Sequence, residues 1–343
     1  MKRLLLILSI MLLSAASLSA QEKPYMVAFW NFENLFDIYD DPETHDEEFL
    51  PDGIKKWNEI KYQKKLSNME RVIFDMASIQ RDYPIVIGVS EIENRTVLED
   101  FVSQPKLKGA NYRICHFDSP DARGVDCAFL YRADVFKLEG SDNIKLVVEG
   151  LPDFRTRDLV VMWGTIEGEP FYFLVSHWPS RLGGKEASQF KRDACAKQIR
   201  EIKDSLLREN PATKVIVMGD FNDDATDASL QKVMGAKGKV KDLQPGDFFN
   251  PYVQMLRAGL GTLAYQDSWN LFDNICVTEN LVNNEPGKLK IIKGKKFYGN
   301  IFRRPYMIQQ EGQYKGYPLR TFVTNNFQNG FSDHLPVYIY IGK

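Results

Sequence analysis

The chain has 343 residues, a formal net charge of −2 at pH 7 and 44% hydrophobic residues. This charge excludes a globally basic surface, so attraction of a polyanionic substrate must come from local patches or from a bound metal ion. The four cysteines contain no Cys-x-x-Cys spacing, which argues against a zinc site, and their positions assign no disulfide.

The first 20 residues are typical of a secretory signal peptide. Basic residues precede an apolar run at 4–13, and small residues follow up to Ala20. The run is too short to anchor the chain in a bilayer, so we expect cleavage after Ala20, with Ala16 as the second choice. Gln21 stands where a lipoprotein would need Cys. We therefore expect residues 21–343 to form a single domain, exported to a periplasm or outside the cell, without a stable membrane anchor.

The segment from 25 to 90 predicts a strand, a helix and a second strand. Residues 25–30 and 84–90 are short and apolar, and the second run is rich in β-branched side chains, as in a buried strand. Between them, apolar side chains recur at steps of four and three, the period of one buried helical face. These positions are Tyr62, Leu66, Met69, Ile73 and Met76. We expect this stripe to pack in the core.

Further along, the sequence predicts many strands and few helices. One helix is expected over 186–207, and strands are expected at 126–131, 159–166, 171–176, 214–218, 274–278 and 335–341. Several of these strands are close enough in sequence to be antiparallel neighbours, so a doubly wound fold fits poorly. Two packed sheets flanked by helices fit better.

Polar residues that suit phosphate-ester chemistry stand at six ends of the predicted strands. They are Asn31 and Asn34, Glu91 and Glu93, His177, Asp220 and Asn222, Asp273, and Asp333 with His334. Strand ends fix the backbone while the following loop exposes the side chain. Carboxylate and amide oxygens suit Mg²⁺, and imidazoles suit proton transfer near neutral pH. A single residue of this kind is usually a helix cap or a hydrogen-bond partner within a loop. This set, however, contains both metal ligands and groups for proton transfer.

The four histidines divide into two pairs. His45 and His116 are expected to be structural or surface residues, whereas His177 and His334 occupy strand ends. His334 cannot use its neighbour Asp333 well, because adjacent strand residues point to opposite faces. It needs a carboxylate from elsewhere, and Asp273 is the candidate.

Six short motifs stand in a characteristic order along the chain. They are Trp30-Asn31, Ser90-Glu91, Ser176-His177, Gly219-Asp220-Phe221-Asn222, Asp273-Asn274-Ile275 and Ser332-Asp333-His334. In identity and order they resemble the endonuclease/exonuclease/phosphatase superfamily, which includes pancreatic deoxyribonuclease. The resemblance extends from Met26 to about Tyr340. It implies an α/β fold, a four-layer α/β/β/α sandwich of two mixed, mostly antiparallel sheets, with the active site at one edge.

The resemblance also implies roles for the motif residues. Asn31, Glu91 and Asp333 are expected at a Mg²⁺ site that could also take Mn²⁺. Asp220 and Asn222 are expected to contact the reacting phosphate and the nucleophile. The family pattern pairs Asp273 with His334, in agreement with the independent argument above.

We therefore predict hydrolysis by in-line attack of water on phosphorus. His334, held by Asp273, is expected to act as general base or charge stabiliser. The metal ion and His177 are expected to neutralise the negative charge that develops on the phosphate and the leaving oxygen.

Four further residues have alternatives that the sequence leaves open. Arg157 resembles an arginine that meets substrate phosphate in nuclease relatives, and Arg181 follows the His177 turn; either could equally be a surface ion-pair residue. Tyr265 could stack on a base or pack. Asp126 could orient His177 or make a plain structural hydrogen bond.

The stretch 288–304 contains seven basic residues and three aromatic residues but no acidic residue. Basic residues alternating with aromatic residues suit nucleic acid or another polyanion. Lysines also protect the edge strand of a sheet from aggregation, so both interpretations stand.

The leading functional prediction is an exported, metal-dependent nuclease that cleaves DNA or RNA phosphodiesters. The alternative within the fold is a phosphatase or phospholipase-type enzyme that acts on inositol phosphates or lipid head groups. The remote alternative is an inactive binding protein of the same fold, against which the complete set of motif residues argues. No protein partner can be inferred.

Overall fold

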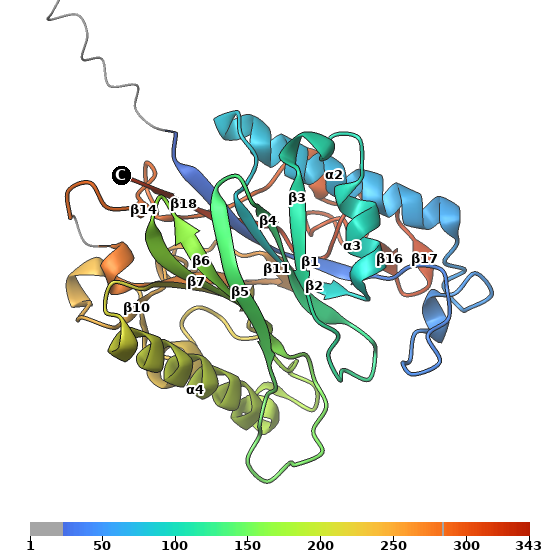
Figure 1. Ribbon diagram of the computed structural model, residues 1–343. Helices are drawn as coiled ribbons and strands as arrows, with labels where there is room; N and C mark the ends of the chain where they lie inside the picture. The colour runs from blue at the N-terminus through green and yellow to red at the C-terminus, as the bar shows by residue number, and fades with distance from the viewer. Residues whose placement is uncertain (1–22, 283–284) are drawn as a thin grey trace, which may run out of the picture.

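Two seven-stranded sheets form the centre of the computed structural model (Figure 1). The structure describes residues 23–282 and 285–343, so the predicted signal peptide lies outside the described residues. Within the described residues, no helix is long and apolar enough to cross a membrane.

The first sheet is built around the strands β1 and β2, which are parallel; its other pairs are antiparallel. In spatial order it contains β14 (Lys290–Ile292), β18 (Val337–Gly342), β1 (Tyr25–Leu35), β2 (Val86–Ile92), β4 (Asp126–Arg132) and β3 (Tyr112–His116), and β15 (Gly299–Ile301) also pairs with β18. Much of the basic stretch 288–304 thus forms edge strands, as the second interpretation expected.

The second sheet is built in the same way around β7 and β8, which are parallel. In spatial order it contains β5 (Phe136–Ile144), β6 (Leu159–Ile166), β7 (Glu169–His177), β8 (Lys214–Asp220), β13 (Asp273–Thr278), β10 (Phe248–Phe249) and β9 (Ala236–Lys237). Of its pairs, β9 with β10 is also parallel, and the rest are antiparallel.

Helices cover the outer face of each sheet (Figure 1). The helices α2 (Glu59–Gln80) and α3 (Arg95–Val102) pack on the first sheet, and α4 (Lys185–Glu209) packs on the second. A short helix, α5 (Val253–Arg257), and two small hairpins, β11 (Leu263–Tyr265) with β12 (Ser268–Asn270) and β16 (Phe322–Val323) with β17 (Asn326–Phe327), complete the fold. The predicted four-layer sandwich is confirmed.

Alternation along β1 shows how the sequence produces these layers. Val27 and Phe29 point into the core between the sheets, whereas Met26, Ala28 and Trp30 pack beneath α2 and α3. Successive strand side chains face opposite sides, so a continuous apolar run supplies both cores at once. The predicted stripe on α2 is buried in the same outer core.

Every strand and helix expected from the sequence is present, and the elements that were missed have weak patterns. β5 is mostly polar and has only one buried residue, and α3 has only eight residues. Short or solvent-facing elements carry little hydrophobic periodicity, so pattern analysis passes over them.

The two parallel pairs bring polar strand ends to one edge of the sandwich. Asn31 lies beside Ser90 at the end of β1 and β2, and His177 lies beside Asp220 at the end of β7 and β8. Asp273, at the start of antiparallel β13, pairs with Asp220. The register of both sheets therefore assembles these side chains.

Replacing Gly219 by Ala should force β7 and β8 apart, because a Cβ there would overlap the carbonyl oxygen of Ser176. Overpacking of this kind costs roughly 1–3 kcal/mol, so the free energy of unfolding in urea should fall by at least that amount. Gly109→Ala is the matched control, since its Cβ would meet its nearest neighbour at an ordinary 3.7 Å. Equal stability of the two variants would contradict this account of strand spacing.

Candidate active site

The backbone turns sharply where β2 and β8 deliver their polar side chains. Glu91 has a φ of 58° and Asn222 a φ of 49°, in the left-handed region that non-glycine residues rarely adopt. The register of β2 with both neighbouring strands shifts between Ser90 and Ile92, so Glu91 sits on a bulge. Bulges and strained backbone re-aim side chains at functional sites.

Asp273 and His334 form a buried pair in the geometry that the sequence predicted. The Nδ1 atom of His334 lies 2.8 Å from Oδ2 of Asp273, which also accepts a hydrogen bond from the Thr262 hydroxyl. The backbone of His334 is held on both sides: its N–H donates to Ser332 Oγ at 3.0 Å, and its carbonyl accepts from Trp30 Nε1 at 2.9 Å. Asp273 therefore orients the imidazole, while Ser332, two residues earlier in the chain, and Trp30 on β1 hold the backbone of His334.

Asp220 lies at the centre of the site. Its Oδ2 accepts a hydrogen bond from Asn31 Nδ2 at 3.1 Å, and its Oδ1 accepts from the Asn222 N–H at 3.0 Å. The same Oδ2 is 3.5 Å from His177 Nε2 and 3.7 Å from His334 Nε2. One carboxylate thus faces both strand-end histidines.

The surroundings give the two histidines different charge states. Burial alone would lower the pKa of His334, but Asp273 and Asp220 outweigh it and raise the pKa well above the ordinary value. Burial, reinforced by Arg157, lowers the pKa of His177 well below the ordinary value. Near neutral pH, His334 is an imidazolium and His177 is neutral, so His177 supplies an N–H rather than the charge expected from the sequence.

Asp220 itself titrates close to neutrality. Burial raises its pKa to about 6; His334 pulls the pKa down, and the neighbouring Asp273 pushes it up. A carboxylate with a pKa near the working pH can both accept and release a proton.

The three residues predicted to hold a metal ion have partners within the same site. Asn34 N–H donates to Glu91 Oε2 at 3.0 Å, and the other oxygen of Glu91 is 3.9 Å from His177 Nε2. Asp333 Oδ2 accepts from Arg320 at 2.7 Å, and Oδ1 is 4.0 Å from His334 Nε2. The side chain of Asn31 bridges Asp220 and the Glu33 N–H.

The donor chemistry of the site fits a divalent cation. Asp220, Asp273 and His334 form a group that could hold a metal ion, and the carboxylates of Glu91 and Asp333 lie beside it. Hard oxygen donors of this kind suit Mg²⁺ or Mn²⁺. Asp273 engages His334 and Thr262 through Oδ2, while its buried Oδ1 has no hydrogen-bond partner within the described residues.

A buried charge network behind Asp333 was not found from the sequence. Lys65 on α2 is fully buried and donates to the Glu33 carbonyl at 2.8 Å and to Thr321 Oγ1 at 2.6 Å. Arg320 pairs with both Glu33 and Asp333. Burial and then Asp333 raise the pKa of Glu33 to about 7. In the sequence, Lys65 falls on the predicted buried face of the helix. A charged residue at such a position is unusual, and it could have indicated a buried ionic network.

Arg157 does not lie where a residue that binds substrate phosphate is needed. Its side chain is buried, pairs with Asp121 at 3.0 Å and donates to the Trp178 carbonyl at 2.7 Å. Arg157 therefore stabilises the turn after β7. Arg157 is an ion-pair residue, but a buried one and not the surface residue of the alternative.

Arg181 also binds the loop after β8 and does not extend freely into solvent. Its Nε donates to the Asn222 carbonyl at 2.8 Å, and its guanidinium pairs with Asp223 and Asp227 and lies over the Phe272 ring. This network holds Asn222 in its left-handed turn. Tyr265, by contrast, is 65% exposed on β11 and faces a cavity that Asp333 also lines.

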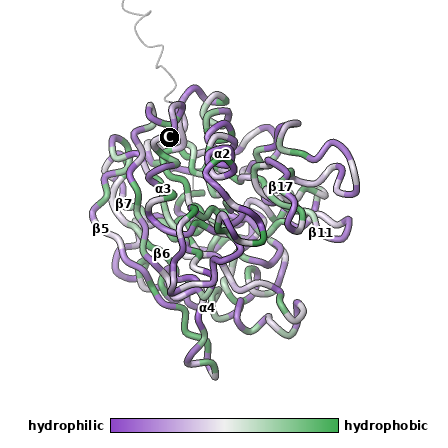
Figure 2. Tube along the Cα trace, turned by 90° about the vertical axis from the view of Figure 1, so that its right-hand side faces the viewer, coloured by the Kyte–Doolittle hydropathy of each residue, from purple (hydrophilic) through white to green (hydrophobic). Residues whose placement is uncertain are grey.

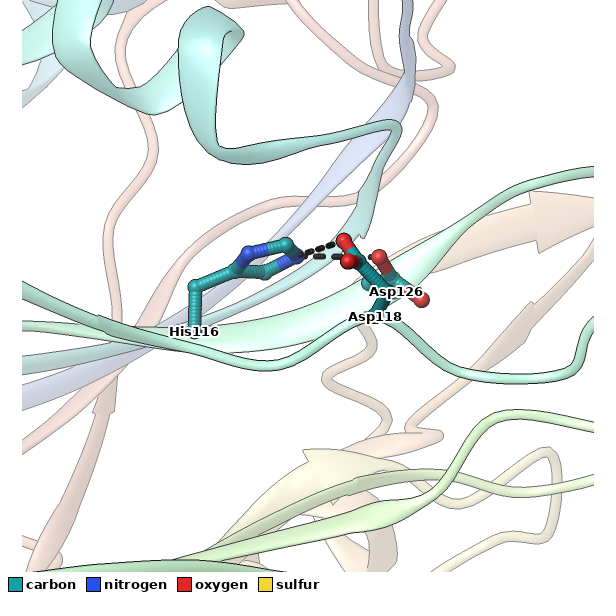
Figure 3. A group of neighbouring side chains, drawn as sticks. All are labelled: His116, Asp118 and Asp126. Atoms are coloured by element: carbon teal, nitrogen blue, oxygen red, sulfur yellow. Dashed lines mark hydrogen bonds and ion pairs between the residues drawn. The ribbon is translucent and has the colours of Figure 1, made fainter. Parts of the chain in front are cut away.

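The assignment of Asp126 to His177 is wrong. Asp126 Oδ2 lies 2.9 Å from Nε2 of His116 (Figure 3). Its other oxygen accepts a hydrogen bond from the Ser119 N–H. His116 pairs with Ala128 in the β3–β4 register, which makes Asp126 its diagonal neighbour on the same face. The structural hydrogen bond was the right alternative. Within the described residues, Nδ1 of His177 has no hydrogen-bond partner.

Replacing Asp273 by Asn should lower the pKa of His334, because the change removes the opposite charge that favours the imidazolium. Titration of the imidazole by NMR would measure this shift. Asp153→Asn, at an exposed loop position, is the control and should leave the titration where it is. A His334 pKa that is the same in the Asp273 variant and in the wild type would contradict the pairing.

Separate replacement of Arg157 by Met and of Asp121 by Asn should each destabilise the protein by roughly 3 kcal/mol, since each leaves a buried charge unpaired. The double variant should lose less than the sum, which a double-mutant cycle of urea unfolding would measure. Additive losses, or a raised KM for Arg157→Met at unchanged stability, would instead favour contact with substrate.

Comparison with known proteins places this site in a family. A sequence model of the Endonuclease/Exonuclease/phosphatase family matches residues 26–343. A comparison with curated proteins gave no match.

Solved structures share the fold at low identity. TDP2 from D. rerio with a single-strand DNA product is 15% identical, with 94% of this chain and 100% of that chain covered and a TM-score of 0.54. The mannosyl-6-phosphatase of Bacteroides thetaiotaomicron is 17% identical, with 93% and 100% covered and a TM-score of 0.52. The human nocturnin catalytic domain with bound sulfate is 16% identical, with 93% and 94% covered and a TM-score of 0.51. With the family match over nearly all described residues, the chain belongs to the endonuclease/exonuclease/phosphatase family, whose members are phosphoesterase hydrolases.

Proposed function

We propose that the protein is a divalent-metal-dependent hydrolase of phosphodiesters, with DNA or RNA as the leading substrate. The observation that carries this proposal is the convergence of Asp220 on two differently charged histidines, one of them paired with Asp273. An inactive binding protein would not need such an array, because burying several ionisable groups together is costly.

The proton-transfer roles follow from the charges of the side chains. Asp220 accepts the proton of the water that attacks phosphorus in line, since its pKa of about 6 leaves it ionised yet basic near neutral pH. His334, as an imidazolium, donates a hydrogen bond to a phosphate oxygen, so its second predicted role, charge stabilisation, is preferred. Asn31 and Asn222 position Asp220 through their hydrogen bonds.

Glu91, Asn31 and Asp333 would hold the metal ion. When bound, a Mg²⁺ or Mn²⁺ ion supplies Lewis-acid stabilisation of negative charge on the phosphate. His177 lies between Glu91 and Asp220 and would donate its Nε2 proton toward the phosphate or the leaving oxygen. Arg320 holds Asp333 in place from the other side.

The alternative is a phosphatase or phospholipase-type enzyme that acts on inositol phosphates or lipid head groups. Proteins of this fold include one solved with a DNA product and one titled a mannosyl-6-phosphatase, so the fold accommodates both substrate types. Phe302 is buried, and Phe297 and Tyr298 pack against the core between the sheets, so only the basic side chains of 288–304 favour a polyanion such as nucleic acid. We also propose export to a periplasm or the medium, on the basis of the first 20 residues.

The proposal predicts that mature protein hydrolyses bis-p-nitrophenyl phosphate with Mg²⁺ or Mn²⁺ and that EDTA abolishes the activity. His334→Ala should lower kcat by roughly 100- to 10,000-fold, because it removes a positioned charge and proton donor. His45→Ala, in an exposed loop, is the matched control and should remain active.

Plasmid, RNA and a panel of phosphomonoesters then separate the two substrate classes. Turnover of only the monoesters would favour the phosphatase. Activity that survives EDTA, or a His334→Ala protein as fast as the control, would overturn the proposed mechanism.

A further inference from the structure

A cavity of about 410 Å³ lies directly beside the reaction centre. One wall comes from the β11–β12 hairpin and the other from the segment 309–323, and β11 and β17 both lie on this side of the molecule (Figure 2). Asp333 lines the cavity and places its Oδ1 4.0 Å from His334 Nε2. A group attached to the reacting phosphate would therefore reach the cavity without leaving the site.

Aromatic rings stand on both walls of the cavity. Tyr265 is 65% exposed on the hairpin, and Tyr314, 39% exposed, lies on the opposite segment with its ring centroid 5.8 Å from that of Tyr317. Large aromatic side chains left open to solvent at a concave site are available for a ligand. Rings on two walls favour a flat, conjugated ring between them over a pyranose, which offers no such π-faces.

The polar groups of the cavity suit a neutral ligand. Gln266, Gln309 and Gln313 offer amides that both donate and accept hydrogen bonds, as the edges of a nucleobase do. Among the residues that line the cavity, the one cation is Arg320, which is already paired with Asp333 and Glu33. A second phosphate would find no free positive charge here and would meet Asp267.

The two walls are tied together before any ligand arrives. The Tyr317 hydroxyl donates to Asp267 Oδ1 at 2.7 Å and accepts from the Asp267 N–H at 2.7 Å. These bonds join the turn of the hairpin to the opposite segment, so the cavity is preformed. A preformed site avoids the entropy cost of ordering loops around a ligand.

We propose that this cavity binds the nucleobase next to the phosphodiester that is attacked, an inference that rests on the proposed function. The volume holds one nucleoside, and a base inside a duplex could not enter without leaving its stack. The substrate class is therefore a single-stranded or terminal nucleotide, with its base between Tyr265 and Tyr314. Specificity would come from the ring, while the reaction centre holds the phosphate.

The test compares dithymidine monophosphate with two analogues that lack one base or the other, assayed by separation of products. The wild type should favour the complete substrate over one of these analogues by roughly tenfold in kcat/KM, the range expected for one stacked base. Tyr265→Ala and Tyr314→Ala should each bring this ratio close to one, mainly by lowering kcat/KM for the complete substrate. Tyr39→Ala, an equally exposed tyrosine outside the cavity, should keep the wild-type ratio.

Two further arms separate the possible failures. Calorimetric titration of thymidine in EDTA tests the cavity without catalysis. Thymidine binding that the Tyr314→Ala substitution removes supports the inference. If such binding is found but no diester is hydrolysed, the proposed function alone fails. Hydrolysis with equal kcat/KM for the complete substrate and both analogues overturns the inference and leaves the proposed function standing. The methyl ester of glucose 6-phosphate tests for a sugar site. If it is hydrolysed faster than dithymidine monophosphate, and the tyrosine variants slow that hydrolysis, the cavity binds a sugar and the inference is overturned.

Discussion

The site depends on one buried interaction, the 2.8 Å contact between the carboxylate of Asp273 and the imidazole of His334. Asp273 opens β13 in one sheet, and His334 lies in the loop just before β18 of the other, so their contact requires the sandwich to close in the observed register. A buried ion pair is weak evidence for stability because desolvation offsets the attraction. The apolar core between the sheets supplies the stability, and the pair is the polar group that this core holds in place.

Crowding of carboxylates is the second constraint. Glu33, Glu91, Asp220, Asp273 and Asp333 share a small region in which the cations are Lys65, Arg320 and the imidazolium of His334. Ionised carboxylates that face one another raise each other's pKa. Burial is the larger cause of the raised pKa values of Glu33 and Asp220, and Asp333 and Asp273 respectively add to it. An added divalent cation would relieve the repulsion between the carboxylates. The proposed acid–base function and the proposed metal site thus draw on the same crowded carboxylates.

Segments outside the sheets decide what can reach the reaction centre. The hairpin β11–β12 and the segment 309–323 are insertions between strands, and they form a cavity beside Asp333. Arg320 belongs to one of these segments and donates a hydrogen bond to Asp333. This bond connects the wall of the cavity directly to the candidate metal ligand. Change in these loops would alter substrate choice while the strand-end residues stay in place.

The sequence by itself determined the two packed sheets flanked by helices and the strand ends that carry the candidate site residues, because apolar runs, helical periodicity and strand-end motifs are local properties of the chain. It named Asp273 as a candidate partner of His334, and the family resemblance pointed to the same pair. Only the tertiary structure decided that Asp126 serves His116 and that Arg157 is buried against Asp121. It alone brought Lys65 and Arg320 behind the site and Tyr265 and Tyr314 to one cavity. These contacts depend on strand register and on loops that approach from distant parts of the chain, and no periodicity in the sequence records which distant residue a side chain will meet.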